Sequence, residues 1–442
     1  MLSFFIFLAM SLSKGGIAPS NVEYDFLIVF VCSNGNNFGN KYKMNEGEIL
    51  LKPLEGLKVL DLSRVLAGPY CTMMLADYGA NIIKIEPPKV GDDSRAFGPF
   101  VGKESAYFMS LNRNKRSMTL NFKNQAEIDV FKEMVKHADV VVENYRPGTM
   151  EKFGLGYDEL KKINPKIIYA ACSGFGHSGP YQYKPAYDII VQAMGGIMSI
   201  TGPEGGEPSR VGASVGDIIA GMFTAYGVMM ALYHREKTGE GQKVDVGMLD
   251  CQVAVLENAI ARYVTSGSVP VPLGNRHPSI TPFASFTAKD GHIIVGAGND
   301  RLWEKLCNIL QRPDLLTDPR FNNNGNRTAN VNALTAILNE VFSHKTISEW
   351  LVVLEAAELP CAPINSIDKI VNDPHIAARE MIVEVEHPVA GHLKMAGVPV
   401  KMSLTPGSVD RPAPLLGQHT AELLKEVLGW DEEKTAAFFA DK

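Results

Sequence analysis

From Leu57 onward, short apolar segments alternate regularly with helical ones, and this alternation restricts the chain to one class of fold. The segments LKVLDLS, ANIIKIE, SMTLNF, DVVVENY, KIIYAACSG and QKVDVGM have the length and apolar character of buried strands. Helices are predicted between several of them, at GPYCTMMLADYG and over 125–137, 186–198 and 218–235. Strands without a polar face need helices on both sides of their sheet. The sequence therefore predicts an α/β domain with a Rossmann-like parallel sheet.

The pattern changes after about residue 265. The segment SITPFASFTAKDGHIIVGAG predicts two strands joined by a turn at Lys289, Asp290 and Gly291. Helices are predicted over 301–310, 331–342, 347–357 and 420–428, with another hairpin in EMIVEVEHPVAGHLKMAGVPV. We expect a large Rossmann-like domain over 52–250 completed by 375–442, and a linker over 251–274. A small α+β domain is expected over 275–365, and 366–442 would form the return segment and the C-terminal part of the large domain.

The first 43 residues do not fit this organisation. MLSFFIFLAMSLSKGG contains an apolar stretch, but no basic residue precedes it and no arginine-rich segment follows. The stretch is also short for a membrane span. Three interpretations stay open for 1–43: a leader, an extra strand, or an extension upstream of a domain that begins near Met44.

Composition narrows the function classes. A net charge of −6 disfavours a nucleic-acid partner, which requires a surplus of Lys and Arg on one face. Hydrophobic residues at 45% and charged residues at 21% are typical of a soluble globular protein rather than a membrane protein. The six cysteines form no CxxC pair and no HExxH motif is present, which favours reduced thiols and no metal. We expect a cytoplasmic protein, or a mitochondrial one if the N-terminus is a leader.

One carboxylate stands out among small and apolar residues. In VGASVGDIIAGM, Asp217 begins a predicted apolar helix, and no Lys, Arg or His lies within six residues on either side. An aspartate at this place is often an N-cap. The amides and dipole of a helix N-terminus would also keep the pKa of the carboxyl low, and the small neighbours leave room for an acyl group. Asp217 is thus either a cap or a nucleophile that forms a covalent acyl intermediate, and the residues alone leave both open.

A glycine-rich segment raises a competing function. Gly174 to Gly179 fits GxGxxG after a strand, and Glu86 ends the second strand, where a ribose-binding acid would lie. In a dinucleotide site, however, these glycines open the next helix, whereas Pro180 and Pro185 interrupt this segment. The first strand–helix turn, RVLAGP, also lacks such glycines. A nicotinamide-dependent oxidoreductase is therefore the less favoured alternative.

Several motifs in the same order resemble the family III CoA-transferases of the CaiB/BaiF type, over nearly all of the chain from Lys52. They are RVLAGPYCTMMLADYGANIIKIEPPKVGDDSR, NRNKRSMTLNFK, VVENYRPG, GFGHSGPY, VGDIIAGMFTAYGVMMALYHREKTGEGQKVDVGMLD and LLGQHTAELL. The resemblance implies a homodimer of interlocked ring-shaped subunits that moves CoA from an acyl-CoA to a free carboxylic acid without a bound cofactor. It also implies that Asp217 is the nucleophile and that Asp188 supports it, although Asp188 could equally cap the next helix.

The resemblance assigns contacts to CoA as well. They are Arg64, Val65, Leu66, Ala67, Leu120, Lys123, Asn144, Tyr145, Arg146 and Lys152. CoA carries a 3′-phosphate and a pyrophosphate, so a site without a P-loop needs separate Lys and Arg side chains. Lys123 follows one predicted strand, and Arg146 and Lys152 follow another. All three are expected at one edge of the sheet, although each alone would more often be a solvated surface charge. Pro87 stands where many family members carry an arginine.

The same family includes α-methylacyl-CoA racemases, which pair the aspartate with a histidine. Tyr187 occupies the position of that histidine here, and a neutral phenol is a poor base at about pH 7. A racemase or epimerase is therefore the runner-up within the family.

The segment GNRHPSITPF bears on which acid accepts CoA. It stands where formyl-CoA transferases have a glycine-rich loop, and this difference argues against oxalate and formyl-CoA as substrates. Arg276 could pair with a distal carboxylate and His277 could assist, although a surface role for Arg276 is as well supported. The segment resembles the succinate-linked dicarboxylate transferases, so we expect succinyl-CoA and a short dicarboxylic acid as substrates.

Overall fold

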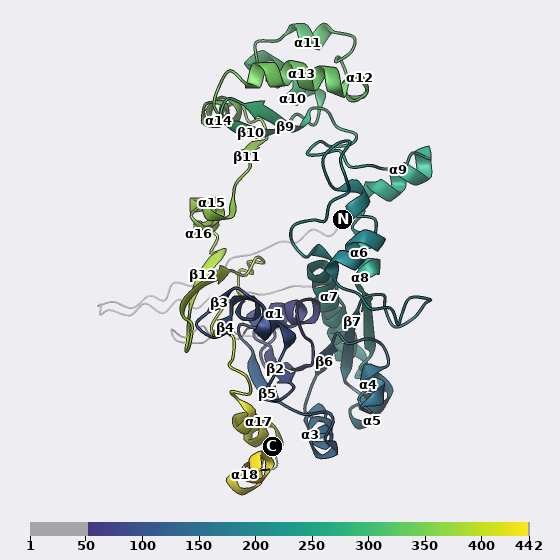
Figure 1. Cartoon of the computed structure of the whole chain (residues 1–442), viewed down its shortest axis with the longest axis vertical. Helices are drawn as coiled ribbons and strands as arrows, with labels where there is room; N and C mark the ends of the chain where they lie inside the picture. The colour runs from purple at the N-terminus through teal and green to yellow at the C-terminus, as the bar shows by residue number, and fades with distance from the viewer. Residues whose placement is uncertain (1–51, 441–442) are drawn as a thin grey trace, which may run out of the picture. The chain divides into compact units, whose positions relative to one another are not determined.

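The computed structural model describes residues 52–440, and a six-stranded parallel sheet forms its centre (Figure 1). In spatial order the strands are β5 (Arg116–Thr119), β2 (Asn81–Glu86), β1 (Lys58–Asp61), β6 (Val140–Glu143), β7 (Ile168–Ser173) and β8 (Lys243–Gly247). Neighbouring strands pair in parallel throughout. All six predicted strands are present, and the predicted α/β fold with a parallel sheet is confirmed. The extension predicted for 1–43 lies outside the described residues.

The chain reverses its direction of winding between β1 and β6. Successive strands are added on one side of β1 as far as β5, and on the other side from β6 to β8. In open α/β sheets, ligands bind outside the carboxyl ends of the strands at such a reversal. The loops after β1 and β6 are therefore where a site is expected on topological grounds.

Helices cover both faces of this sheet. On one face, α1 (Ala67–Asp77) and α7 (Val215–Thr238) pack against Ile168 and Ala170 of β7 through an apolar core. On the other face, α3 (Gln125–Val135) and α5 (Tyr157–Ile163) enclose Tyr169 and Ala171 of the same strand. Because helices cover both faces, every residue of β7 is buried, and this explains its nearly continuous apolar sequence.

The crossing of α1 and α7 depends on a glycine. A Cβ at Gly221 would lie 2.6 Å from the carbonyl oxygen of Ala67, which is closer than real Cβ atoms approach backbone. Gly221 is one helical turn after Asp217, and Ala67 is the first residue of α1. The close approach therefore brings the start of α1 beside Asp217.

Further elements of the first half are α2 (Ala106–Leu111), α4 (Thr149–Lys152), α6 (Asp188–Met194) and α8 (Met248–Ala254), with the short hairpin of β3 (Phe100–Val101) and β4 (Glu104–Ser105). The helix predicted over 186–198 is shorter than expected, because Gly196 adopts a φ of 86° two residues after α6 ends. The predicted linker over 251–274 contains an unpredicted helix, α9 (Asn258–Ser266).

A second, antiparallel sheet contains β9 (Phe283–Ala288), β10 (Gly291–Gly296) and β11 (Cys361–Pro363), and the predicted hairpin turn is confirmed. Its helices are α10 (Asp300–Ile309), α11 (Asp314–Thr317), α12 (Asn324–Ala329), α13 (Val331–Phe342) and α14 (Ile347–Ala356). These elements enclose a hydrophobic core of their own, with Phe286, Trp303 and Trp350 at its centre. The exact domain boundaries stay a prediction.

The C-terminal segment contains α15 (Ile367–Val371), α16 (Pro374–Ala378), the predicted hairpin of β12 (Ile382–His387) and β13 (Gly391–Ala396), α17 (Thr420–Leu428) and α18 (Glu432–Ala440). The helix predicted over 420–428 is confirmed as α17, whereas α18 was not predicted. Figure 1 shows α17 beside β5 and α3. Arg116 at the start of β5 pairs there with Glu422 at 2.7 Å, and also with Glu426. The helix α17 thus covers β5, which is an edge strand of the large sheet.

Candidate active site

The loops that leave β1 and β6 are joined by one side chain. The carboxamide of Asn144, directly after β6, accepts a hydrogen bond from the backbone N–H of Arg64 at 2.8 Å. It also donates to the carbonyl oxygen of Arg64 at 2.7 Å. Both polar groups of the Asn144 side chain therefore bind the main chain of the loop after β1. The two loops meet at the point where the sheet reverses its winding.

Three adjoining cavities surround these loops. The Phe122 cavity, of about 420 Å³, is lined by Arg64, Ile85, Glu86, Pro87, Leu120, Asn121, Phe122, Lys123, Tyr145, Arg146, Thr149 and Phe153. The Ala186 cavity, of about 140 Å³, has among its lining residues Arg64, Val65, Leu66, Ala67, Asn144, Tyr145, Arg146, Ser173, Ala186, Tyr187 and Asp217. The Tyr107 cavity, of about 810 Å³, is lined by Val65, Val90, Gly91, Asp92, Asp93, Ala96, Phe97, Tyr107, Tyr187, Asp188, Ile189, Arg210 and Asp217.

The shared lining residues order the cavities into one path. Arg64, Tyr145 and Arg146 line both the Phe122 and the Ala186 cavities. Val65, Tyr187 and Asp217 line both the Ala186 and the Tyr107 cavities. Asp217 therefore lines both the smallest and the largest of these three cavities.

Most of the predicted CoA contacts lie along this path. Arg64, Leu120, Lys123, Tyr145 and Arg146 line the Phe122 cavity, and Val65, Leu66, Ala67 and Asn144 join the Ala186 cavity. Lys123 and Arg146 are exposed, so their charges are available to phosphate groups. Lys152, at the end of α4, lines none of the three cavities.

Asp217 is not the N-cap of its helix. The helix begins at Val215 with Ser214 as N-cap, so Asp217 is the third helical residue, and Ser214 makes no side-chain capping bond. The expectation of a low pKa is wrong too. Burial, and then the neighbouring Asp188 carboxylate, raise the pKa of Asp217 to about 7. The helix dipole is outweighed because the side chain is half-buried beside a second acid.

Asp188 is a buried acid held by several donors. Its Oδ1 accepts the backbone N–H of Gly216 at 2.9 Å, and its Oδ2 accepts Arg210 Nη2 at 3.1 Å. Gln192 Nε2 donates to both oxygens, at 3.0 and 2.9 Å. A Cβ at Gly216 would lie 3.0 Å from Asp188 Oδ1, so this close contact between the starts of α6 and α7 favours glycine. Asp188 thus lies next to the residue that precedes Asp217, and its supporting role stays a prediction.

Two side chains of the Tyr107 cavity were not singled out as site residues from the sequence. Arg210 is the cationic residue among the described residues that line this cavity. Tyr107, from α2, also lines it, and burial, followed by the charge of Asp217, raises the pKa of Tyr107 to about 12. Tyr107 is therefore a neutral hydroxyl near the aspartate. Neither residue belongs to a local motif; Arg210 only precedes Asp217 by seven residues.

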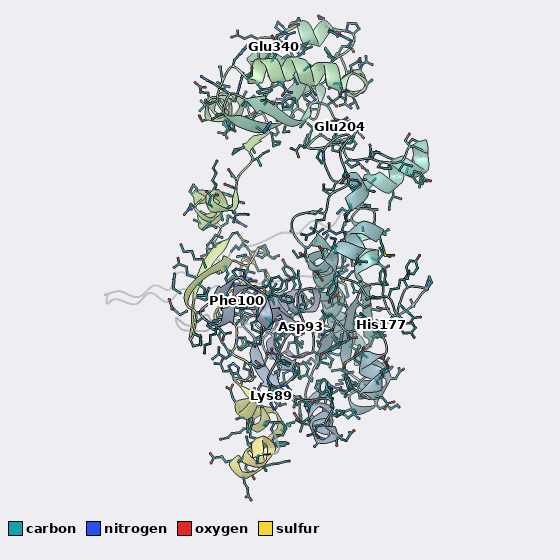
Figure 2. The ribbon with its side chains drawn as sticks, in the orientation of Figure 1. Lys89, Asp93, Phe100, His177, Glu204 and Glu340 are labelled. Atoms are coloured by element: carbon teal, nitrogen blue, oxygen red, sulfur yellow. The ribbon has the colours of Figure 1, made fainter. Side chains whose placement is uncertain are left out.

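Arg276 and His277 lie elsewhere in the described chain. The guanidinium of Arg276 forms a two-point ion pair with Glu204, with Nη2–Oε1 at 2.7 Å and Nε–Oε2 at 3.1 Å. His277 Nδ1 accepts the N–H of Ser279 at 3.1 Å. Figure 2 labels Glu204 away from Asp93, the residue that pairs with Arg64 at the β1 loop. Neither Arg276 nor His277 lines a cavity with Asp217, so their role in acid binding stays a prediction.

The residues of the competing dinucleotide interpretation are engaged in other contacts. The Glu86 carboxylate is buried and accepts Arg95 Nε at 2.7 Å, Arg95 Nη2 at 2.8 Å and Ser117 Oγ at 2.6 Å. Gly176 and Gly179 adopt left-handed turns, with φ of 77° and 83°, and the next helix, α6, begins only at Asp188. The glycines therefore open no helix toward a pyrophosphate.

Comparison with known proteins identifies the family to which the chain belongs. The chain is 42% identical over 384 residues to the human succinyl-CoA:glutarate CoA-transferase, covering 86% of this chain and 87% of that protein. It is 45% identical over 376 residues to the acetyl-CoA:oxalate CoA-transferase of Acetobacter aceti, covering 85% and 95%. A crystal structure of a CaiB/BaiF family protein from Brucella suis superimposes with a TM-score of 0.76 at 38% identity, covering 85% and 99%. The pattern of CoA-transferase family III matches residues 54–420, and the chain is therefore an enzyme of that family.

Proposed function

We propose that this CoA-transferase uses Asp217 as a covalent nucleophile to move CoA from succinyl-CoA to a short dicarboxylic acid. The Asp217 carboxylate attacks the thioester carbonyl, and CoA leaves as a thiolate, which gives a mixed anhydride. The thiolate then attacks the aspartyl carbonyl, which releases succinate and leaves an aspartyl-CoA thioester. The acceptor carboxylate repeats both steps in reverse. The observation that carries this proposal is the place of Asp217 at the junction of the Ala186 and Tyr107 cavities.

The raised pKa of Asp217 suits the first step. An ordinary aspartate, with a pKa of about 4, is a much weaker base than the thiolate it must displace, since a free thiol has a pKa of about 8.5. Burial and Asp188 raise the pKa of Asp217 to about 7, which narrows that gap while leaving much of the group ionised near neutral pH. The same shielding from water protects the anhydride against hydrolysis.

The path of cavities suits an extended acyl-CoA. The Phe122 cavity offers Arg64, Lys123 and Arg146 to the phosphates. The Ala186 cavity would take the pantetheine arm, since it leads from these charges to Asp217. The Tyr107 cavity would then hold the acyl group and, in the second half-reaction, the acceptor acid.

Two arginines, Arg276 and Arg210, are candidates to bind the distal carboxylate of the acid. Arg276, the residue predicted from the sequence, is paired with Glu204. Arg210 lines the Tyr107 cavity with Asp217, and its guanidinium gives only one N–H to Asp188 and a long contact of 3.5 Å to Ser214. Further N–H groups of Arg210 are free to bind a carboxylate, so we favour Arg210. A dicarboxylic acceptor agrees with the names of the glutarate and oxalate relatives, although GNRHPSITPF argues against oxalate itself.

Trapping with hydroxylamine tests the covalent step. The protein is incubated with succinyl-CoA and hydroxylamine, and the peptide that contains Asp217 is examined by mass spectrometry. A hydroxamate at Asp217 is expected, because the mixed anhydride and the aspartyl-CoA thioester are both activated acyl derivatives of Asp217 that hydroxylamine attacks. A peptide that stays unmodified while CoA is transferred would overturn the mechanism. Assays with glutarate, oxalate, succinate and a monocarboxylate then define the acceptor.

We further propose that the enzyme is a homodimer of interlocked ring-shaped subunits. In support, α7 carries an exposed apolar stripe of Met222, Phe223, Tyr226, Met229, Met230 and Tyr233. Spacings of three and four residues place these side chains on one helix face, and soluble monomers seldom leave so large an apolar face in water. Light scattering on the purified protein should give twice the mass of 48.2 kDa, and a monomer at micromolar concentration would contradict the proposal.

A reducing compartment is proposed as well, in the cytoplasm or, if residues 1–43 act as a leader, in mitochondria. The described cysteines, Cys71, Cys172, Cys251, Cys307 and Cys361, are all unpaired thiols. Thiols that remain unpaired are typical of such compartments. Cell fractionation with an antibody to the chain tests this location, and recovery from the secreted fraction would contradict it.

A further inference from the structure

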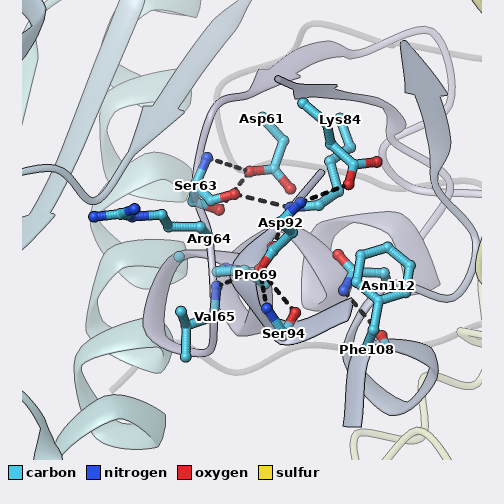
Figure 3. Close-up of polar contacts among 12 residues, drawn as sticks. Asp61, Ser63, Arg64, Val65, Pro69, Lys84, Asp92, Ser94, Phe108 and Asn112 are labelled. Atoms are coloured by element: carbon cyan, nitrogen blue, oxygen red, sulfur yellow. Dashed lines mark hydrogen bonds and ion pairs between the residues drawn. The ribbon is translucent and has the colours of Figure 1, made fainter. Parts of the chain in front are cut away.

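Side chains from other parts of the chain bind main-chain groups of the turn between β1 and α1, residues 63–65, and Figure 3 shows the contacts of Lys84 and Asp92. The Lys84 ammonium, from β2, donates to the carbonyl oxygen of Ser63 at 2.8 Å. Asn144 binds both main-chain groups of Arg64. Asp92 Oδ1 accepts the N–H of Val65 at 3.0 Å. The conformation of this turn is therefore imposed from outside it.

Lys84 and Asp92 also pair with each other, and we call this ion pair, with its bonds to the Ser63 carbonyl and the Val65 N–H, the bracket. Lys84 Nζ lies 2.8 Å from Asp92 Oδ2, and the two side chains are 0% and 1% exposed. The ammonium thus bridges the Ser63 carbonyl and a carboxylate whose other oxygen binds the Val65 N–H. Burial raises the pKa of Asp92, but Lys84 and the backbone N–H groups of Ser94 and Val65 together outweigh burial and hold this pKa well below its usual range. Stability alone gives little reason to keep such a pair, because apolar replacements of buried ion pairs are often neutral.

The bracket holds an unfavourable backbone conformation. Val65 has a φ of 66°, in the left-handed region where a β-branched residue is an outlier. Such conformations persist only where the surroundings enforce them, and they cluster at binding and active sites. Val65 lines both the Ala186 and the Tyr107 cavities, the two that contain Asp217. Val65, whose conformation the surroundings enforce, therefore lines the same cavities as Asp217, the proposed nucleophile.

We propose that Asp92, fixed by Lys84, is a positioning residue that holds Val65 in the left-handed conformation and thereby shapes the Arg64–Ala67 segment to bind acyl-CoA beside Asp217. Asp92 acts through Val65 and needs no contact with the reacting atoms. The inference rests on the proposed function, since it assigns the segment its acyl-CoA ligand. It predicts that losing the bracket weakens acyl-CoA binding more than acid binding.

The primary test is Asp92→Asn. An asparagine can turn its oxygen toward Val65 or toward Lys84 but not toward both, so one side of the bracket is lost. We expect KM for succinyl-CoA, and the dissociation constant for CoA measured by calorimetry, to rise about tenfold or more, as strain of this kind allows. KM for the acceptor acid should change less than about threefold, a distinction that a general loss of folding does not produce.

Adding Val65→Gly to the Asp92→Asn protein separates positioning from plain structural damage. Glycine adopts positive φ without steric strain, so the turn no longer needs enforcement. The double variant should recover CoA affinity by about threefold or more relative to Asp92→Asn alone, since the strain that the bracket opposes has been removed. A folded Asp92→Asn protein with unchanged CoA affinity, or a double variant with no recovery, overturns the proposal.

Asp77→Asn is the matched control. Asp77 is also buried in an ion pair, with Arg113 at 2.7 Å, and both side chains are 3% exposed. It does not touch the 63–65 turn, so its loss should lower the melting temperature without a selective rise in KM for succinyl-CoA. A selective rise of equal size in Asp77→Asn would show that Asp92 has no special role.

If Asp92→Asn does not fold, Val65→Pro tests the same idea with the ion pair intact. Proline fixes φ near −65° and has no N–H, so the turn cannot adopt its present conformation. Normal CoA affinity in that variant would refute the inference. Calorimetric CoA binding also separates this inference from the proposed function, because wild-type protein that binds CoA but transfers none refutes the latter and leaves the positioning test valid.

Discussion

Asp188 Oδ1 accepts a 2.9 Å hydrogen bond from the backbone N–H of Gly216, the residue immediately before Asp217. This bond fixes a second carboxylate beside the first, at the starts of two neighbouring helices. Burial and Asp188 together raise the pKa of Asp217 to about 7. The catalytic behaviour of the enzyme near neutral pH should therefore depend on this pair.

The first prediction concerns the pH dependence of catalysis. Only the ionised Asp217 is a nucleophile, so kcat/KM for succinyl-CoA should rise with pH through an apparent pKa of about 7. Asp188→Asn removes the neighbouring charge and should move this acid limb to lower pH. Gly216 can still donate to the asparagine oxygen, so the start of α7 should stay in place. An acid limb at the same pH in both proteins would show that Asp188 does not act on Asp217.

The second prediction concerns stability. The folded protein keeps a proton on Asp217 up to about pH 7, whereas the unfolded chain releases it at about pH 4. The folded state binds more protons in that window, so its free energy of unfolding falls as the pH rises. Asp217→Asn should therefore stabilise the protein by roughly 1–3 kcal/mol at about pH 8, and much less at about pH 4.5. Denaturant unfolding at both pH values measures this, and equal effects would contradict the raised pKa.

The third prediction separates the basic residues of the CoA path. Lys123→Ala and Arg146→Ala remove charges that line the Phe122 cavity, so each should raise KM for succinyl-CoA by roughly fivefold to fiftyfold. The effect should weaken at high salt, because these charges are exposed. Lys152→Ala is the control, since Lys152 lines none of the three cavities. A larger effect at Lys152 than at the other two would show that the phosphates lie elsewhere.

The fourth prediction decides between Arg210 and Arg276 as the partner of the distal carboxylate. Arg210→Ala should raise KM for dicarboxylic acids about tenfold or more relative to a monocarboxylate of similar length. Arg276→Ala should leave this ratio near the wild-type value, because Arg276 is paired with Glu204 outside the Tyr107 cavity. Steady-state kinetics with both kinds of acid give the ratio. The reverse pattern would support the original sequence assignment of Arg276.

The fifth prediction concerns the crossing of α1 and α7. In Gly221→Ala the added Cβ would meet the Ala67 carbonyl oxygen at 2.6 Å, so one helix must shift. Overpacking of this kind should destabilise the fold by about 1–3 kcal/mol and displace Asp217 from the CoA path. Gly239→Ala is not an equivalent control because Gly239 has a φ of 77°. Gly212→Ala is suitable, since a Cβ at Gly212 meets no atom within 4 Å.

The sequence predicted the large sheet well because each strand is marked by its own residues. Strands such as β6 and β7 are buried on both faces, so their apolar runs are strong local signals. The helix α9 was missed because it lies in a stretch that resembled a linker, although Ile260, Tyr263 and Val264 have the i, i+3, i+4 spacing of a helix.

The candidate site was predicted only in part, for a physical reason. Resemblance located Asp217, but its expected cap position and low pKa came from nearby residues alone. The apolar run from Ile218 hid the fact that the helix starts earlier, at Val215. The acid that shifts its pKa, Asp188, is 29 residues away in sequence and becomes a neighbour only when α6 and α7 pack together. The bracket on the 63–65 turn likewise joins residues from β2 and from the loop that follows it.

The contact between Arg116 and the C-terminal helix α17 has a consequence for biosynthesis. Arg116 Nη2 donates to Glu426 Oε1 at 2.9 Å across a sequence separation of 310 residues. On the ribosome, β5 emerges long before its partner is translated, so this edge of the sheet stays uncovered while all of α10–α16 is being made. Nascent chains that stall before α17 would expose an unprotected strand edge, and they are the species on which chaperones and proteases should act.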